Sequence, residues 1–115
     1  MFGTHKSQDT RRALRFFSER RVKVHFVDLR ERAASKGELT RFIQKFGLTA
    51  LIDRSSPRYL DLGLASGRYS DEHWINLLCD EPLLLRQPLT RFGGKLTVGA
   101  EEKAWQQWID TEKKS

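Results

Sequence analysis

The spacing of hydrophobic residues predicts four helices, because apolar side chains recur every three to four positions in four segments of the chain. These segments are residues 8–20, 36–46, 71–79 and 101–111. Ser35 and Glu38 have the spacing of a capping box, and Gly47 follows the last apolar position of the same segment. The second helix therefore has the clearest predicted beginning and end.

Shorter apolar runs predict four strands. They are the stub at residues 1–2, then residues 22–29, 89–92 and 95–98. Residues 22–29 are mostly apolar on both faces, as expected of a strand that helices cover on both sides. Gly93 and Gly94 separate the last two strands and indicate a hairpin.

The order of these elements predicts one α/β domain over residues 1–115. Strand, helix and strand at the start of the chain indicate a parallel βαβ unit. Residues 48–64 form short helical pieces, which we interpret as a helical insertion before the hairpin. We therefore expect a mixed four-stranded sheet with flanking helices, and a frayed end at residues 113–115.

Composition narrows the class of protein. The 115 residues, 38% of them hydrophobic, suffice for one core. An apolar run of about 18 residues and a secretory signal are both absent, so we expect no membrane span and a cytoplasmic location, as in a bacterial cytosolic protein. The net charge of +6 favours anionic partners, although a solvated basic surface explains it equally well.

The cysteine and histidine content argues against metal binding and disulfides. Cys79 is the one cysteine, so no intramolecular disulfide can form, and no zinc-type Cys/His cluster exists. Asp80 and Glu81 follow Cys79, and negative neighbours disfavour a thiolate. We therefore interpret Cys79 as structural.

The candidate site is the segment 2–13, which has the pattern of a strand end, a tight polar loop and the first turn of a basic helix. Ser7 is a suitable helix cap, and free N–H groups at such a helix start stabilise negative charge. Lys6 and Arg11 add positive charge. The residues whose N–H groups would hold an anion are Gln8, Asp9 and Thr10.

This loop resembles the active-site loop of the arsenate-reductase-like (ArsC/Spx) family, which has the thioredoxin fold. The resemblance covers nearly the whole chain and is strongest in residues 6–12, 62–64 and 82–99. It implies a thioredoxin-like sheet with a helical insertion, and a cis-proline at Pro88 opposite the loop. It also implies a thiol-dependent oxidoreductase with a glutathione, glutaredoxin or thioredoxin-type reductant and no other cofactor.

In this family a cysteine at the position of Ser7 attacks an oxyanion or a disulfide sulfur. A serine hydroxyl needs an adjacent base to become nucleophilic. His5 is close in sequence, but no third group that would orient it is identifiable, and helix capping accounts for Ser7. We therefore expect the chain to lack thiol chemistry at this loop.

Two hypotheses account for the serine. In the first, Ser7 replaces a native cysteine on purpose, and the basic helix start around an active-looking loop motivates this view. In the second, Ser7 is natural and the domain is a non-catalytic binder.

The resemblance also implies three arginines around an oxyanion in the arsenate reductases. Those places fall on Asp53, Gln87 and Val98. Arg54 and Arg86 are their neighbours, and we take both as candidate charge partners, with Arg86 joining Ser7 and Arg11 as candidate catalytic residues. Because the three donors are missing, we expect weak arsenate turnover even with cysteine at position 7.

The alternative function is a non-catalytic, Spx-like regulator or protein-binding module. The resemblance implies that such regulators bind the α subunit of RNA polymerase and often switch through two cysteines in the loop. Ser7 and Thr10 occupy those two positions, so the redox switch is absent. No base-reading motif is evident, so we expect no direct contact with nucleic acid, and we expect a monomer.

Overall fold

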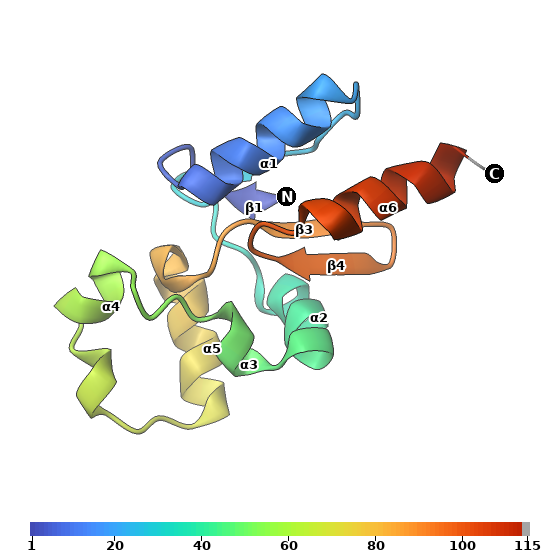
Figure 1. Ribbon diagram of the computed structural model, residues 1–115. Coiled ribbons are helices and arrows are strands. Elements are labelled where there is room, and N and C mark those ends of the chain that lie inside the picture. Colours follow the sequence, from blue (N-terminus) through green and yellow to red (C-terminus); the bar gives the residue numbers. More distant parts are fainter. Residues whose placement is uncertain (114–115) are drawn as a thin grey trace.

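The computed structural model describes residues 1–113, which form a four-stranded sheet covered by helices on both faces (Figure 1). The strands are β1 (Phe2–Gly3), β2 (Val27–Asp28), β3 (Leu89–Phe92) and β4 (Lys95–Val98). Their order is β2-β1-β3-β4, with β2 parallel to β1 and the other neighbours antiparallel. The predicted mixed sheet and its hairpin are confirmed.

Six α-helices are present in the described residues: α1 (Gln8–Glu19), α2 (Lys36–Phe46), α3 (Leu48–Leu51), α4 (Pro57–Asp61), α5 (Asp71–Asp80) and α6 (Glu102–Lys113). Two 3₁₀ turns, η1 (Leu64–Ser66) and η2 (Pro82–Leu84), complete the elements. The four long helices and the helical insertion are as predicted. The expectation of a frayed end does not hold at Lys113, which is the last residue of α6, and residues 114–115 lie outside the described residues. None of the described helices has the length and apolar character needed to cross a membrane.

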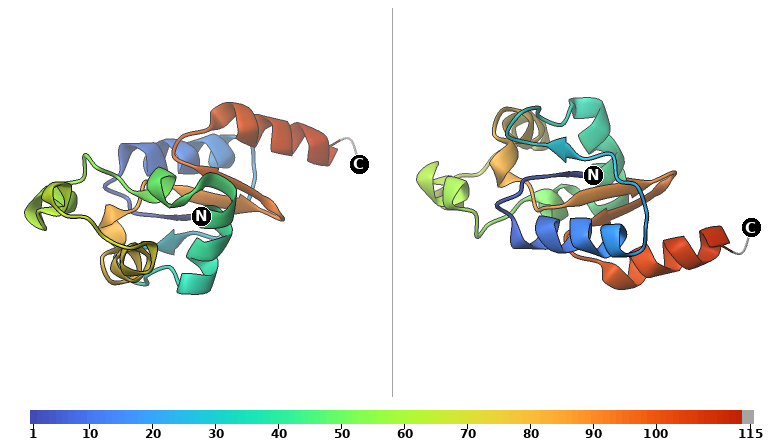
Figure 2. Two further views of the ribbon diagram at one scale, coloured as in Figure 1. Left: turned by 90° about the horizontal axis from the view of Figure 1, so that it is seen from below. Right: turned by 90° about the horizontal axis from the view of Figure 1, so that it is seen from above.

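One face of the sheet is covered by α1 and α6, which lie side by side (Figure 2). Phe17 of α1 and Trp105 of α6 pack with ring centroids 5.4 Å apart. The indole N–H of Trp105 donates to the hydroxyl of Thr97 in β4 at 2.9 Å, so a buried polar atom is satisfied where α6 meets the sheet. Arg12 and Glu102 form an ion pair between the two helices at the surface.

The other face is covered by α2, α3 and α5, whose apolar side chains form a separate core cluster with the sheet. Leu39, Leu51 and Leu78, one from each helix, are fully buried in this cluster. An isolated antiparallel bridge between Ile52 and Leu85 joins the insertion to the segment that leads into β3. This bridge matters for the site, because it fixes the insertion beside β3.

The predicted second strand is shorter than expected, because β2 comprises only Val27–Asp28 instead of residues 22–29. Its partner β1 has two residues, so only two register pairs form and residues 22–26 lack a neighbouring strand. The predicted two apolar faces are nevertheless present. Val24 and Phe26 pack against the α1–α6 cluster, whereas Leu29 belongs to the opposite cluster.

Gly3 of β1 lies in tight contact with α1, and an added methyl group has no room there. A Cβ at Gly3 would lie 2.6 Å from Oγ1 and 2.7 Å from Cγ2 of the buried Thr10. We expect Gly3→Ala to lower the free energy of unfolding by about 1–3 kcal/mol, as overpacking does in well-packed interiors, when measured by urea denaturation.

The matched control is Gly37→Ala in α2, where nothing lies within 4 Å of an added Cβ. This variant should raise the free energy of unfolding by about 0.5–1 kcal/mol, because alanine favours helix more than glycine does. Equal stability of the two variants would contradict the tight contact at Gly3.

Candidate functional site

A cleft of about 660 Å³ opens at the carboxyl end of β1. Its lining comes from the loop before α1, the turn after β2, residues 53–58 of the insertion, and residues around η2 and the ends of the β3–β4 hairpin. Segments that are far apart in sequence therefore meet around the loop that carries Ser7.

Ser7 lines this cleft and caps α1. Its hydroxyl oxygen accepts a hydrogen bond from the backbone N–H of Thr10 at 3.2 Å. The backbone N–H of Ser7 donates to the carbonyl of Thr4 at 3.1 Å, which closes the loop into a tight turn. The predicted capping role of Ser7 is thus confirmed.

His5 is not a base for Ser7. Its ring lies against Phe26, with ring centroids 4.8 Å apart, and among residues 1–113 no hydrogen bond joins it to Ser7. The serine hydroxyl therefore has no neighbour in the described structure that would remove its proton.

Gln87 ties the loop to the start of β3. Its side-chain carbonyl oxygen accepts hydrogen bonds from the backbone N–H of Thr4 at 2.7 Å, from the Thr4 hydroxyl at 3.0 Å and from the Thr10 hydroxyl at 3.4 Å. Both threonines are buried, so these donors have no access to water. Sequence reasoning missed this role, since no local pattern indicates which distant donors a glutamine will meet.

Pro88 follows directly and is fully buried outside the cleft lining, and the Gln87–Pro88 peptide bond is cis, as the family resemblance implies. The carbonyl oxygen of Pro88 accepts a hydrogen bond from the backbone N–H of Gly99 at 2.9 Å. This contact holds the end of β4 against the start of β3 beside the site.

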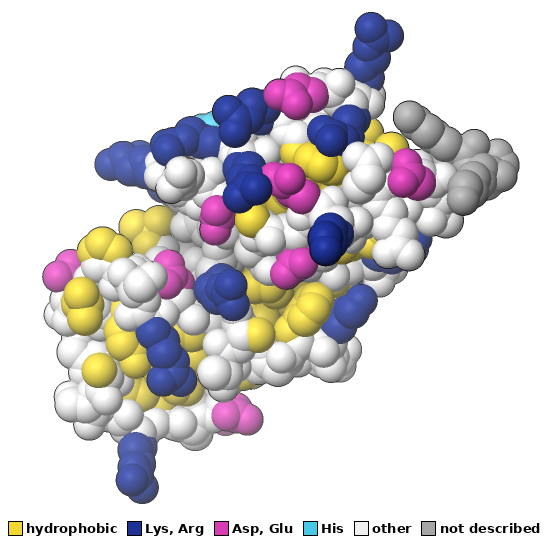
Figure 3. Space-filling model, viewed as in Figure 1, with side chains coloured by type: hydrophobic (Ala, Val, Ile, Leu, Met, Phe, Trp, Pro, Cys, Tyr) yellow, Lys and Arg dark blue, Asp and Glu magenta, His cyan; other side chains and the backbone are white. Residues whose placement is uncertain are grey.

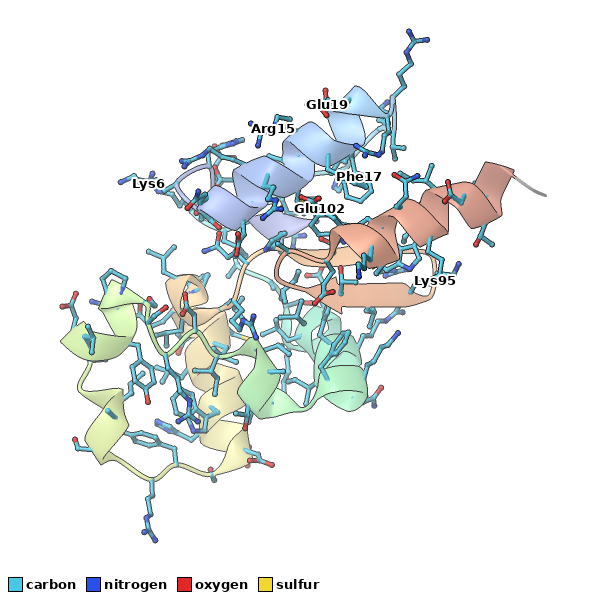
Figure 4. All side chains as sticks on the ribbon, viewed as in Figure 1. Lys6, Arg15, Phe17, Glu19, Lys95 and Glu102 are labelled. Carbon is cyan, nitrogen blue, oxygen red and sulfur yellow. The ribbon has the colours of Figure 1, made fainter. Side chains whose placement is uncertain are left out.

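The structure brings four of the predicted site residues together in the cleft lining: Lys6, Ser7, Asp9 and Arg86. The guanidinium of Arg86 lies over Gly99, with Nη2 at 3.4 Å from the position a Cβ would take there. Figure 4 shows Lys6 extending outward from the loop before α1.

The remaining predicted residues lie elsewhere. Arg11 folds back over the loop, where its Nη1 donates to the carbonyl oxygens of His5 at 3.0 Å and Lys6 at 3.5 Å, so it braces the loop. Thr10 is buried behind the loop, whereas Gln8 and Arg54 are exposed and lie outside the cleft lining.

Two arginines that sequence reasoning did not select, Arg30 and Arg58, also line the cleft. Arg58 makes a two-pronged contact with Glu81, at 2.8 Å from Nε and 2.7 Å from Nη2. Hydrogen bonding to Arg58 lowers the pKa of Glu81. The pair keeps Glu81 ionised and offsets the charge of Arg58, so Arg58 contributes little net charge to the cleft.

Lys and Arg side chains also gather over α1 at the surface (Figure 3). Arg15 stands on the outer side of this helix (Figure 4). The basic face predicted for α1 therefore points to solvent and adjoins the loop that carries Ser7.

Cys79 lies on α5, half-buried against the core cluster. Burial raises the pKa of its thiol, and the charge of Asp80 raises it further, while Lys36 acts in the opposite direction. The expected effect of the acidic neighbour is thus confirmed. Within residues 1–113, no group of three or more His, Cys, Asp or Glu side chains is arranged to hold a metal ion.

The sheet, the helical insertion and the capped loop beside a proline define a thioredoxin-like protein of the arsenate-reductase type. The chain matches the ArsC family model over residues 2–108 and belongs to the ArsC family.

Similar proteins agree with this assignment. The chain is 29% identical over 101 residues to the uncharacterized protein YusI of Bacillus subtilis (strain 168), a match that spans 84% of this chain and 86% of that protein. It is 35% identical over 68 residues to an arsenate reductase of Yersinia enterocolitica, across 56% of this chain and 48% of that protein. The solved YFFB (PA3664) protein shares the fold, with a TM-score of 0.83, 19% identity, and coverage of 92% of this chain and 94% of that chain.

The hydrogen bonds that Gln87 accepts from Thr4 and Thr10 can be tested by mutation. Gln87→Met keeps the length of the side chain but removes the acceptor, which leaves three donors of buried Thr4 and Thr10 without a partner. We expect the free energy of unfolding to fall by about 2–3 kcal/mol in urea denaturation.

Gln87→Glu is the control, because a carboxylate oxygen can accept the same hydrogen bonds. It should retain more stability than Gln87→Met at neutral pH. If the two variants lose the same stability, the acceptor is not what holds the loop.

Proposed function

We propose that this chain is the scaffold of a thiol-dependent oxidoreductase of the glutathione or glutaredoxin type, in which serine occupies the nucleophile position and the protein is inactive as written. The observation that carries the proposal is the place of Ser7, which caps α1 and faces the cleft. The membership of the chain in the ArsC family supports it.

The surroundings of Ser7 suit a thiolate better than a hydroxyl. The N-terminus of a helix and nearby cations lower the pKa of a thiol, and Lys6 and Arg11 lie in or over the loop. A cysteine at this position would attack one sulfur of a disulfide, form a new S–S bond and release the other sulfur as a thiolate. Glutathione disulfide is such a substrate, and the reducing glutathione pool of the cytoplasm would restore the thiol.

Arsenate is not the substrate that the cleft favours, although relatives of this chain are arsenate reductases. Of the three places where the resemblance implies arginines in the arsenate reductases, Asp53 brings a negative charge to the lining and Gln87 uses its oxygen within the protein. Val98 is buried in the core cluster. An oxyanion with several negative charges would therefore lack those three arginine donors here.

A second candidate function is that of a non-catalytic, Spx-like regulator or protein-binding module. The Lys and Arg side chains gathered over α1 favour it, because a basic face attracts an acidic protein surface such as one on the RNA polymerase α subunit (Figure 3). This function requires no nucleophile, so a serine at position 7 would not impair it.

The first test restores the thiol. We expect Ser7→Cys to gain one glutathione, read as intact mass, when treated with glutathione disulfide, while the unaltered protein gains none because Cys79 has a raised pKa. The double variant Ser7→Cys/Cys79→Ala is the control and should react like Ser7→Cys. If the thiol at position 7 stays unmodified, the oxidoreductase proposal fails and the binding module becomes the better account.

The second test concerns arsenate. With glutathione and glutaredoxin as reductants, we expect Ser7→Cys to reduce arsenate at a rate close to that of the unaltered protein, since its cleft lacks the three arginines. Coupled consumption of NADPH measures the rate, with an active arsenate reductase as the positive control. A rate comparable to that control would overturn the exclusion of arsenate.

A further inference from the structure

The cleft beside Ser7 offers charges of both signs to a ligand. Arg86 lines it, and within residues 1–113 its guanidinium forms no hydrogen bond or ion pair. Asp53 also lines it, and no cation of the described chain pairs with its carboxylate. A negative and a positive side chain therefore both remain available in one cleft.

Asp53 and Arg86 are held by the same piece of backbone. The backbone N–H of Asp53 donates to the carbonyl of Leu84 at 2.8 Å, and the backbone N–H of Arg86 donates to the carbonyl of Leu51 at 2.8 Å. These two hydrogen bonds flank the bridge between Ile52 and Leu85. The two charged residues are thus anchored independently of any ligand.

One carboxylate oxygen of Asp53 is already used within the protein. Its Oδ1 accepts hydrogen bonds from the backbone N–H of Ser55 at 3.0 Å and from the Ser55 hydroxyl at 2.6 Å. These contacts orient the carboxylate, and the second oxygen is left as an acceptor for a ligand donor.

Gln87 supplies a neutral donor beside them. Its side-chain oxygen faces Thr4 and Thr10, because a backbone N–H can donate only to the oxygen of the amide. Gln87 also lines the cleft, so its N–H₂ group is the part that remains for a ligand.

We propose that this cleft binds a ligand with an α-amino-carboxylate head group, with Asp53 accepting hydrogen bonds from the ammonium and Arg86 holding the carboxylate. Such a zwitterion satisfies both charges, whereas a multiply charged oxyanion would meet the carboxylate of Asp53. The inference rests on the proposed function and narrows it, because the γ-glutamyl end of glutathione carries this head group.

The test uses the protein with Ser7 in place, so that only non-covalent binding is measured. Reduced glutathione and glutaryl-cysteinyl-glycine, which lacks the α-amino group, are each titrated and followed by NMR. We expect the analogue to bind about tenfold more weakly or worse, the loss typical of one hydrogen bond to a charged group. Because the analogue is the more anionic of the two, simple attraction to a basic protein predicts the opposite order.

Variants identify the residues that cause the difference in affinity between glutathione and the analogue. Asp53→Asn keeps an oxygen for Ser55, and we expect it to weaken glutathione binding about tenfold without weakening the binding of the analogue. Arg86→Gln should weaken both ligands. The matched control is Asp61→Asn, which removes an exposed carboxylate of α4 outside the cleft lining and should change neither affinity.

Any one of three results would overturn the inference. The analogue binds as tightly as glutathione or more tightly, Asp53→Asn binds glutathione with unchanged affinity, or neither peptide binds. The reaction of Ser7→Cys separates this result from the proposed function. If that variant is modified equally fast by glutathione disulfide and by the disulfide of the analogue, the oxidoreductase proposal stands and the head-group inference falls. If Ser7→Cys stays unmodified while the unaltered protein still binds glutathione more tightly than the analogue, the head-group inference stands and the oxidoreductase proposal falls.

Discussion

The site depends on one hydrogen-bond acceptor, the side-chain oxygen of the half-buried Gln87. It meets two donors of Thr4 and one of Thr10, so it joins the end of β1, the first turn of α1 and the start of β3. Buried donors without a partner are costly, and no other described side chain accepts from these groups. The loop that carries Ser7 is therefore held in place by Gln87, a residue that is distant from it in sequence.

The same junction explains why the first strand can be so short. β1 has two residues, and Gly3 lets it approach α1 so closely that Thr10 fills the space of a missing side chain. The aromatic cluster between α1 and α6 fixes the helix on the sheet. With α1 held on its apolar face and at its first turn, the loop needs few contacts of its own.

Sequence reasoning found those features that local patterns encode. The cap at Ser7, the capping box at Ser35 and the hairpin at Gly93 each depend on neighbours within a few residues, and each was predictable. The extent of β2 was not, because a strand ends where its partner ends. The contacts of Gln87 and Arg58 were missed for the same reason, since their partners lie 83 and 23 residues away.

Serine at position 7 fits the geometry of the loop around it. A helix cap needs a short side chain with an acceptor, and the Ser7 hydroxyl meets that need through the N–H of Thr10. Gln87, Arg11 and the bridge at Ile52 also hold the segments around the cleft, and none of their contacts involves the side chain at position 7. The fold is thus compatible with either residue, and in our proposal the cleft recognises its ligand through Asp53, Arg86 and Gln87, which all line it.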